Sequence, residues 1–233
     1  MAVTNQPFSV VRGKVARFTK LSECGAPLSG QLGQGVTKGF VKIEYKPEID
    51  DGEDITLTNA DGELLVNEPA CPTLRYYTVQ ITFGRVDPEL YSLATGQQLV
   101  VDYAGNPVGM RVGQKMACDG GFALETWSGT GGGGCGSATA ARRFGYFLLP
   151  WVRQGVLQDF TLENGAASFV IAGKTADGSQ WGTGPYPVVA ADATGTPGKL
   201  LTPIGAGQHL HFELTPIAPP APANGLGQIP AMS

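Results

Sequence analysis

One turn near the middle of the chain constrains the fold more than any other feature of the sequence. Asn164-Gly165 is the residue pair best suited to the two positive-φ positions of a type I′ turn. A two-residue loop sets the register of its hairpin, with Phe160 opposite Phe169 and Leu162 opposite Ala167. One face is then wholly apolar and consists of Phe160, Leu162, Ala167, Phe169 and Ile171. Turn and pattern together predict a sheet protein with one face buried.

Alternating patterns predict further strands. In residues 40–46, Val41, Ile43 and Tyr45 share one face, with charged residues on the other. In residues 73–83 the shared apolar face consists of Tyr77, Val79, Ile81 and Phe83. The remaining predicted strands cover residues 55–58, 64–66, 99–103, 108–112, 121–127, 143–151 and 209–214.

The sequence also predicts one short helix. Asp87 is a suitable N-cap, Pro88 suits the first helical position, and Gly96 suits the C-terminal end. A helix of about two turns is not stable alone, so it must pack on the rest of the protein. The residues expected to face the sheet are Leu90, Leu93 and Ala94.

Composition supports a mainly β fold with many turns. The 233 residues include 34 glycines and 17 prolines, and only 15% are charged. We predict a single β-barrel or sandwich domain of about ten strands, with one short helix, over residues 36–214. An N-terminal arm and loop region is expected over residues 1–35, and a Pro-rich extended tail over 215–233. Residues 128–138 are too rich in glycine to be part of the framework.

Charge and cysteine usage exclude some classes of function. A net charge of −4 argues against a protein that grips nucleic acid through its phosphates. Cys24, Cys71, Cys118 and Cys135 are widely spaced, without a CxxC pair, so we expect free thiols and assembly in a reducing cytoplasm. No apolar run has the length of a signal peptide core or a membrane span, and none is expected.

The last predicted strand contains a candidate metal site. Alternation places His209, His211 and Glu213 on one face, and such a row can bind zinc or another transition metal. The same pattern is also that of a polar strand face opposite buried Leu210 and Phe212. These are the only two histidines in the chain, so we expect no metal and no cofactor, with this row as the one candidate.

The chain has no pattern typical of catalysis. It lacks a Gly-x-Ser-x-Gly elbow, and no cysteine lies in an evidently activated setting, so we expect no catalytic residues and no enzyme. Trp127, Trp151 and Trp181 suit a sugar-stacking platform, although tryptophans in so glycine-rich a chain are more often core or interface anchors.

An acidic segment follows the strand over residues 40–46. Its carboxylates do not have the spacing of an EF-hand loop, although a weak cation site of another geometry stays open. The alternatives are a solvated loop or one that meets a basic surface on a neighbour. We expect these residues to contribute to contacts between subunits: Glu48, Asp50, Asp51, Glu53 and Asp54.

Several framework patterns resemble one known family. They are Asn67-Glu68-Pro69 and residues 76–83, 86–90, 95–97, 149–152, 163–167 and 181–186. These resemble the major tail (tail tube) proteins of long-tailed, non-contractile phages that infect actinobacteria. The resemblance covers most of residues 20–215 and includes neither the glycine-rich loop nor the Pro-rich tail.

The resemblance implies a structural virion protein. Such subunits form hexameric rings in which sheets of neighbours join into an inner barrel, and rings stack through long loops and terminal arms. DNA passes along the lumen without specific binding, and the other partners are tape-measure and tail terminator or tip proteins. The subunit would be located in the virion tail after assembly in the bacterial host cytoplasm. The alternative is another virion or surface β-sandwich, such as a capsid decoration or carbohydrate-binding protein.

Overall fold

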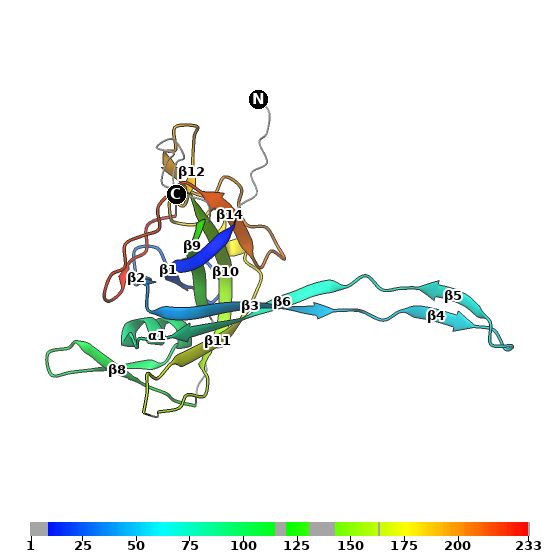
Figure 1. Ribbon diagram of the computed structural model, residues 1–233, viewed down its shortest axis with the longest axis horizontal. Helices are drawn as coiled ribbons and strands as arrows, with labels where there is room; N and C mark the ends of the chain where they lie inside the picture. The colour runs from blue at the N-terminus through cyan, green and yellow to red at the C-terminus, as the bar shows by residue number, and fades with distance from the viewer. Residues whose placement is uncertain (1–8, 115–119, 131–142, 163, 233) are drawn as a thin grey trace.

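The computed structural model describes residues 9–114, 120–130, 143–162 and 164–232. It confirms a mainly β fold with one short α-helix (Figure 1). A large antiparallel sheet has the strand order β15-β2-β1-β9-β10-β11-β6-β3, and β14 pairs with β10. Its strands are β1 (Val10–Leu21), β2 (Leu32–Thr37), β3 (Phe40–Asp50), β6 (Thr73–Phe83), β9 (Gly121–Thr130), β10 (Phe144–Leu157), β11 (Phe169–Thr175), β14 (His211–Thr215) and β15 (Gly227–Gln228).

Three two-stranded ladders complete the β structure. They are β4 (Ile55–Thr58) with β5 (Leu64–Glu68), β7 (Gln98–Val101) with β8 (Pro107–Arg111), and β12 (Val189–Ala190) with β13 (Pro197–Gly198). The described residues thus contain more strands than the ten expected, because several elements are ladders of two to five residues. A 3-10 turn, η1 (Ser179–Trp181), follows β11.

The centre of the large sheet is buried on both faces. In β9, every residue between its two terminal residues is buried. One face carries Trp127 and Tyr146 and is covered by a long segment between η1 and β14. The other face carries Phe18 and Phe122, which pack against the β6 side of the curled sheet and against the helix. Coverage on both sides explains why β9 does not alternate between buried and exposed residues.

The expectation of an arm and loop region over residues 1–35 is wrong from Val10 onward. β1 lies near the middle of the sheet, between β2 and β9, and its residues 15–19 are buried. Arg17 points into the core and is paired there with Glu125. The sheet also includes β2 and β15, so the domain extends beyond residues 36–214 at both ends. Residues 1–8 lie outside the described ranges.

A bulge changes the predicted face of β3. Phe40 pairs with Phe83 and Lys42 with Thr82, which leaves Val41 without a partner residue. Ile43 and Tyr45 pack toward the core as expected, whereas Val41 is 68% exposed. The extra residue of a bulge shifts the alternation by one, and strict periodicity does not reveal it.

The predicted register of the Asn164-Gly165 hairpin is wrong. Leu157 lies opposite Ile171, one residue away from the predicted register. β10 ends at Leu157 and β11 begins only at Phe169, so neither strand reaches the turn. Gly165 does not have the positive φ that a type I′ turn requires, and Glu163 lies outside the described residues. Phe160 is largely exposed because no other part of the described chain covers this end of the hairpin, although its ring still contacts Phe169 with centroids 5.0 Å apart.

The helix α1 (Pro88–Thr95) has the predicted caps. Asp87 Oδ1 accepts a hydrogen bond from the backbone N–H of Leu90 at 3.2 Å, and Gly96 ends the helix in the left-handed conformation. Leu90 and Ala94 are buried, and Leu93 packs partly against the same core. The helix therefore closes one end of the core, as its apolar face predicts.

Replacement of Leu90 tests this docking. Leu90 is 1% exposed, so we expect Leu90→Ala to lower the free energy of unfolding by about 2–5 kcal/mol through lost burial and a new cavity. Leu201→Ala is the matched control because Leu201 is 73% exposed, and we expect a change within about 0.5 kcal/mol. Urea unfolding followed by circular dichroism measures both, and equal losses would show that the helix is not docked through Leu90.

The Pro-rich tail is extended and lies along its own chain. β15 pairs with β2, and the backbone N–H of Ile229 donates to Gln31 O at 3.0 Å. The Ile229 side chain is 1% exposed. In this structure the tail thus covers the β2 edge of the sheet, which would otherwise present unpaired backbone groups.

Candidate assembly surfaces

A long two-stranded arm projects from one side of the molecule (Figure 1). We define the arm as residues 48–75, which comprise the ends of β3 and β6 and the whole of the β4–β5 ladder. Ten extended residues, from Asp50 to Asn59, span about 30 Å. The expected radius of gyration of a domain of about 200 residues is only about 16 Å. The arm therefore extends well beyond the body of its own subunit.

Local sequence explains where the strand pairing of the arm is interrupted and where the chain turns at its tip. Its two ladders are separated at Pro69 and Pro72, which have no backbone N–H to donate to a strand partner. At the tip, Asn59 Oδ1 accepts hydrogen bonds from the backbone N–H groups of Asp61 and Glu63 at 3.0 and 2.7 Å. Gly62 provides the positive φ of the turn, at 85°. The tip is thus an ordered turn, as its Asn-Ala-Asp-Gly sequence predicts.

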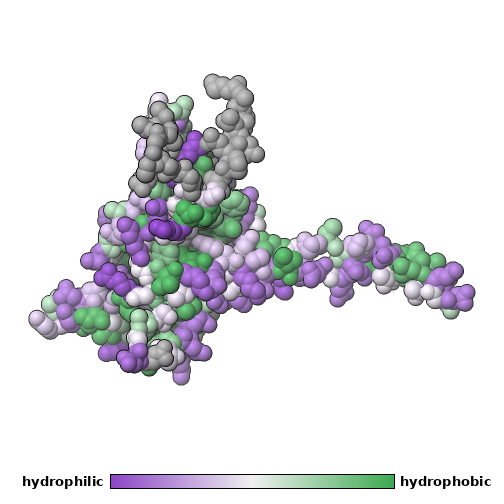
Figure 2. Space-filling view, in the orientation of Figure 1, coloured by the Kyte–Doolittle hydropathy of each residue, from purple (hydrophilic) through white to green (hydrophobic). Residues whose placement is uncertain are grey.

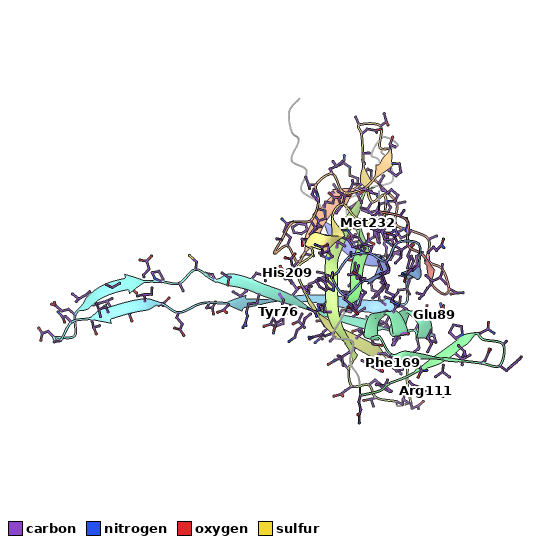
Figure 3. All side chains as sticks on the ribbon, turned by 180° about the vertical axis from the view of Figure 1, so that it is seen from behind. Tyr76, Glu89, Arg111, Phe169, His209 and Met232 are labelled. Atoms are coloured by element: carbon purple, nitrogen blue, oxygen red, sulfur yellow. The ribbon has the colours of Figure 1, made fainter. Side chains whose placement is uncertain are left out.

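The arm exposes apolar side chains that the described part of the chain does not cover. From Ile49 to Arg75 every residue is exposed except Asn59 and Ala70, which are half-buried. The exposed apolar residues are Ile49, Ile55, Leu57, Leu64, Leu65, Val66 and Leu74. Figure 2 shows separate hydrophobic patches on the arm, near its base and near its tip, among hydrophilic residues, and Figure 3 shows side chains pointing away from the ribbon on both sides, beyond Tyr76 at its base. An isolated two-stranded ribbon is marginally stable in water, so this surface is typical of one that packs on a partner.

One face of the arm tip is predominantly apolar. In the β4–β5 ladder Leu57 pairs with Val66, and Ile55 pairs with Glu68. Paired residues and residues two apart share a face, so Ile55, Leu57 and Val66 lie together. We call these three residues the apolar face of the arm.

The five acidic residues expected at subunit contacts all lie on the arm. Glu48 and Asp50 are in β3, whereas Asp51, Glu53 and Asp54 lie between β3 and β4. Two make contacts within the arm: Asp50 lies 3.8 Å from the guanidinium of Arg75, and Asp54 accepts a hydrogen bond from the backbone N–H of Ala70 at 2.8 Å. Glu48 and Asp50 thus belong to a strand of the arm, whereas Asp51, Glu53 and Asp54 lie in the unpaired stretch between its two ladders.

Charge is divided unevenly between the arm and the rest of the chain. The arm has eight carboxylates and a single basic residue, Arg75, which gives it a net charge of −7. The rest of the chain has 12 acidic and 15 basic residues and a net charge of +3. The overall value of −4 conceals this division, and the arm complements a surface that is basic and partly apolar.

The histidine row does not form a metal site in this structure. His211 Nε2 lies 3.6 Å from Glu213 Oε2 on β14. His209 lies before the strand, where its Nδ1 and the hydroxyl of Thr175 are 2.9 Å apart. Among the described residues, no group of three or more His, Cys, Asp and Glu side chains is placed to hold a metal ion.

The tryptophans do not form an exposed platform. Trp127 and Trp181 are buried in the core, and Trp151 packs against it and donates from Nε1 to Gly120 O at 2.8 Å. The three tryptophans therefore anchor the core and do not form a sugar-stacking surface. Cys24 and Cys71 are free and exposed, whereas Cys118 and Cys135 lie outside the described ranges.

A buried ionic network lies beneath the covering segment, and sequence reasoning missed it. Arg17 donates from Nε and Nη2 to the two carboxylate oxygens of Glu125, each at 2.6 Å, and Tyr146 donates to Glu125 at 2.8 Å. The guanidinium stacks on Tyr186, 3.4 Å from the ring centroid. Burial raises the pKa of Tyr146 well above its usual value and that of Tyr186 to about 12, so both hydroxyls remain protonated. The network joins β1, β9 and β10 to the covering segment.

Neither a scan against protein-family models nor a search of curated proteins finds a match to this chain. Within the described ranges, no helix combines the length and the apolar character needed to cross a bilayer.

Proposed function

We propose that this protein is a structural subunit that assembles into stacked hexameric rings, the tail tube through which a long-tailed phage delivers its DNA. The observation that carries the proposal is the arm. It is longer than the expected radius of gyration of its own domain, it exposes seven large apolar side chains, and it has a net charge opposite to that of the body. Such a segment is stabilised when it packs on another subunit.

Energetics favour an assembled state over a free one. Full burial of one Leu or Ile side chain contributes about 1.5–3 kcal/mol. Burial of the apolar face of the arm on a neighbour would therefore contribute several kcal/mol at each contact, and rings repeat each contact around the tube. Association also costs translational and rotational entropy, so repeated contacts are needed for a stable assembly.

The sheet supplies a second surface for assembly. β3 is the terminal strand of the large sheet, and among the described residues its ladder partner is β6 alone. An open strand edge can accept a strand of a neighbour, which is the joint that the resemblance to tail tube proteins implies. The role we propose is structural and not catalytic, and it needs no cofactor.

The proposed partners are further copies of this chain, together with tape-measure and tail terminator or tip proteins. DNA would pass through the lumen without specific binding. A strongly basic lining would retain the passing polymer through its phosphates, so we expect the residues that line the lumen not to be predominantly basic. We propose the virion tail as its location and the host cytoplasm as the site of assembly, where the free thiols of Cys24 and Cys71 are stable.

Electron microscopy of the purified protein over a wide concentration range tests the proposal. We expect hollow rings or tubes of uniform bore that become more abundant with concentration, because the arm carries its binding surface into solution. The control is the same protein with Ile55, Leu57 and Val66 replaced by serine, which should remain monomeric. Discrete monomers or trimers at every concentration, with tail initiator proteins also added, would contradict the tube and favour a decoration or binding module.

A further inference from the structure

We propose that the apolar face of the arm binds a specific groove on the body of a second copy of this chain. The groove lies at the seam where β3 curls back over β1 and β9. Its volume is about 390 Å³, and Phe40, Val41, Ile43 and Phe147 are among its lining residues. This contact rests on the proposed function, because the binding partner is taken to be another copy of the same chain.

The groove exists because β3 approaches β1 and β9 without pairing with them. Tyr45 and Thr126 make a hydroxyl contact of 2.9 Å across the seam. Gly13 lies directly against Phe40, and a Cβ atom at this glycine would come within 2.8 Å of the phenyl ring. The seam is therefore closed at these points and open between them, where apolar side chains line it.

The bulge in β3 adds to this apolar surface. It leaves Val41 68% exposed at the groove, and Val10 is 53% exposed on the β1 side. Beside the groove Phe212 is also largely exposed, and its ring stacks on Phe147 with centroids 6.2 Å apart. The groove and its surroundings thus form an apolar surface that the described part of the chain leaves exposed, and this surface matches the apolar face of the arm.

Charge favours this groove as the acceptor. Within the described ranges Lys42 is the one charged residue in its lining, and its ion-pair partner is the exposed Glu44, a contact worth little in water. Two other grooves on the body contain charges of both signs that balance: Lys38 and Arg85 with Asp87 and Glu89 in one, and Lys20 with Glu23 in the other. Their linings therefore have no net charge, whereas Lys42 gives the lining of this groove one positive charge, which attracts an arm of net charge −7.

The geometry requires that the arm and the groove belong to different copies. The arm leaves the body at its base and extends outward, so its tip cannot fold back to the seam of its own subunit (Figure 1). A contact between two different surfaces of identical chains is heterologous, and such contacts generate closed rings or open filaments. One contact of this kind for each subunit therefore suits either a ring or a stack of rings.

Disulfide trapping between two variants tests the groove. In a background with all four cysteines replaced by serine, Leu57→Cys on the arm and Val41→Cys in the groove are prepared separately and mixed. We expect a mixed disulfide dimer, identified by mass spectrometry, that forms at least about tenfold faster than with Val101→Cys in place of Leu57→Cys. Val101 is the matched control because it is 56% exposed on the β7–β8 hairpin and Leu57 is 55% exposed.

Salt dependence provides a second measurement. Between about 0.1 M and about 1 M salt the Debye length falls from about 10 Å to about 3 Å. We expect the rate of trapping between positions 57 and 41 to fall about tenfold, because charge steers the arm to the groove. A rate that does not change with salt would overturn the electrostatic part of the proposal.

Electron microscopy of the same mixtures separates this inference from the proposed function. Tubes without the 57–41 disulfide would overturn the groove and leave the tube intact. The disulfide with only small discrete particles would support the groove and contradict the tube. Equal trapping of Leu57→Cys and Val101→Cys would overturn the groove whatever particles are seen.

Discussion

Arg17→Met is expected to lower the free energy of unfolding by about 3–5 kcal/mol, which is at the upper end of what a single substitution costs a folded protein. It leaves Glu125, which is 0% exposed, as a buried carboxylate without its cationic partner. Tyr146 would still donate one hydrogen bond, but a neutral donor does not replace an ion pair with two contacts of 2.6 Å. For a chain of this size the loss corresponds to a fall in Tm of about 6–20 °C.

Two control variants make this result specific. Lys42→Met removes the cation of the exposed Lys42–Glu44 pair and should change stability by less than about 1 kcal/mol. The double variant Arg17→Met/Glu125→Leu removes both buried charges and should recover most of the loss. Urea unfolding of monomeric protein measures all three variants. A loss for Arg17→Met no larger than that for Lys42→Met would show that the buried pair does not stabilise the fold.

Excision of the arm is expected to abolish assembly and to leave the fold intact. Asp50 and Thr73 are paired across β3 and β6, so residues 51–72 can be replaced by Asn-Gly, which closes the shortened hairpin with a two-residue turn. The excised residues include the apolar face of the arm and are almost entirely exposed. We therefore expect a Tm within a few degrees of the parent protein and no rings or tubes at any concentration.

A second variant separates the effect of removing the arm from the effect of changing its charge. Charge reversal at Asp50, Asp51 and Asp54 keeps the length of the arm and its apolar face. Since these residues carry three of its eight carboxylates, we expect slower assembly that is less sensitive to salt. Sedimentation velocity measures the oligomers formed by each variant. Tubes of parental yield and length from the excised protein would show that the arm has no part in assembly.

Sequence patterns correctly predicted those features of the fold that depend only on neighbouring residues. The N-cap at Asp87, the left-handed Gly96 and the inward face of β6 depend on a few neighbouring residues and occur as expected. The bulge at Val41 and the loop before Phe169 depend on packing across the sheet, which the alternation of a single strand does not contain. A favourable turn pair does not form a tight hairpin when no surface covers its apolar face.

The candidate surfaces were predictable only in part. The acidic residues were found as a segment that follows a predicted strand, and the strands over residues 55–58 and 64–66 from their places on either side of a predicted turn. Neither pattern indicates that these strands continue the β3–β6 ribbon into solvent. The burial of β1 was not predicted, because residues 1–35 were expected to be an arm and loop region and no local pattern shows a partner for a buried Arg17. Its partner Glu125 is 108 positions away, and only the tertiary fold brings the two charges together.

The prolines that interrupt the arm have a mechanical consequence. Between the β3–β6 and β4–β5 ladders, no ladder hydrogen bond joins residues 51–54 to residues 69–72. The ribbon can therefore change its angle at this joint without loss of a ladder hydrogen bond, and in the proposed assembly its tip would stay bound to the neighbouring subunit. A filament whose subunits are connected through such joints would curve by small changes at each level instead of breaking at one.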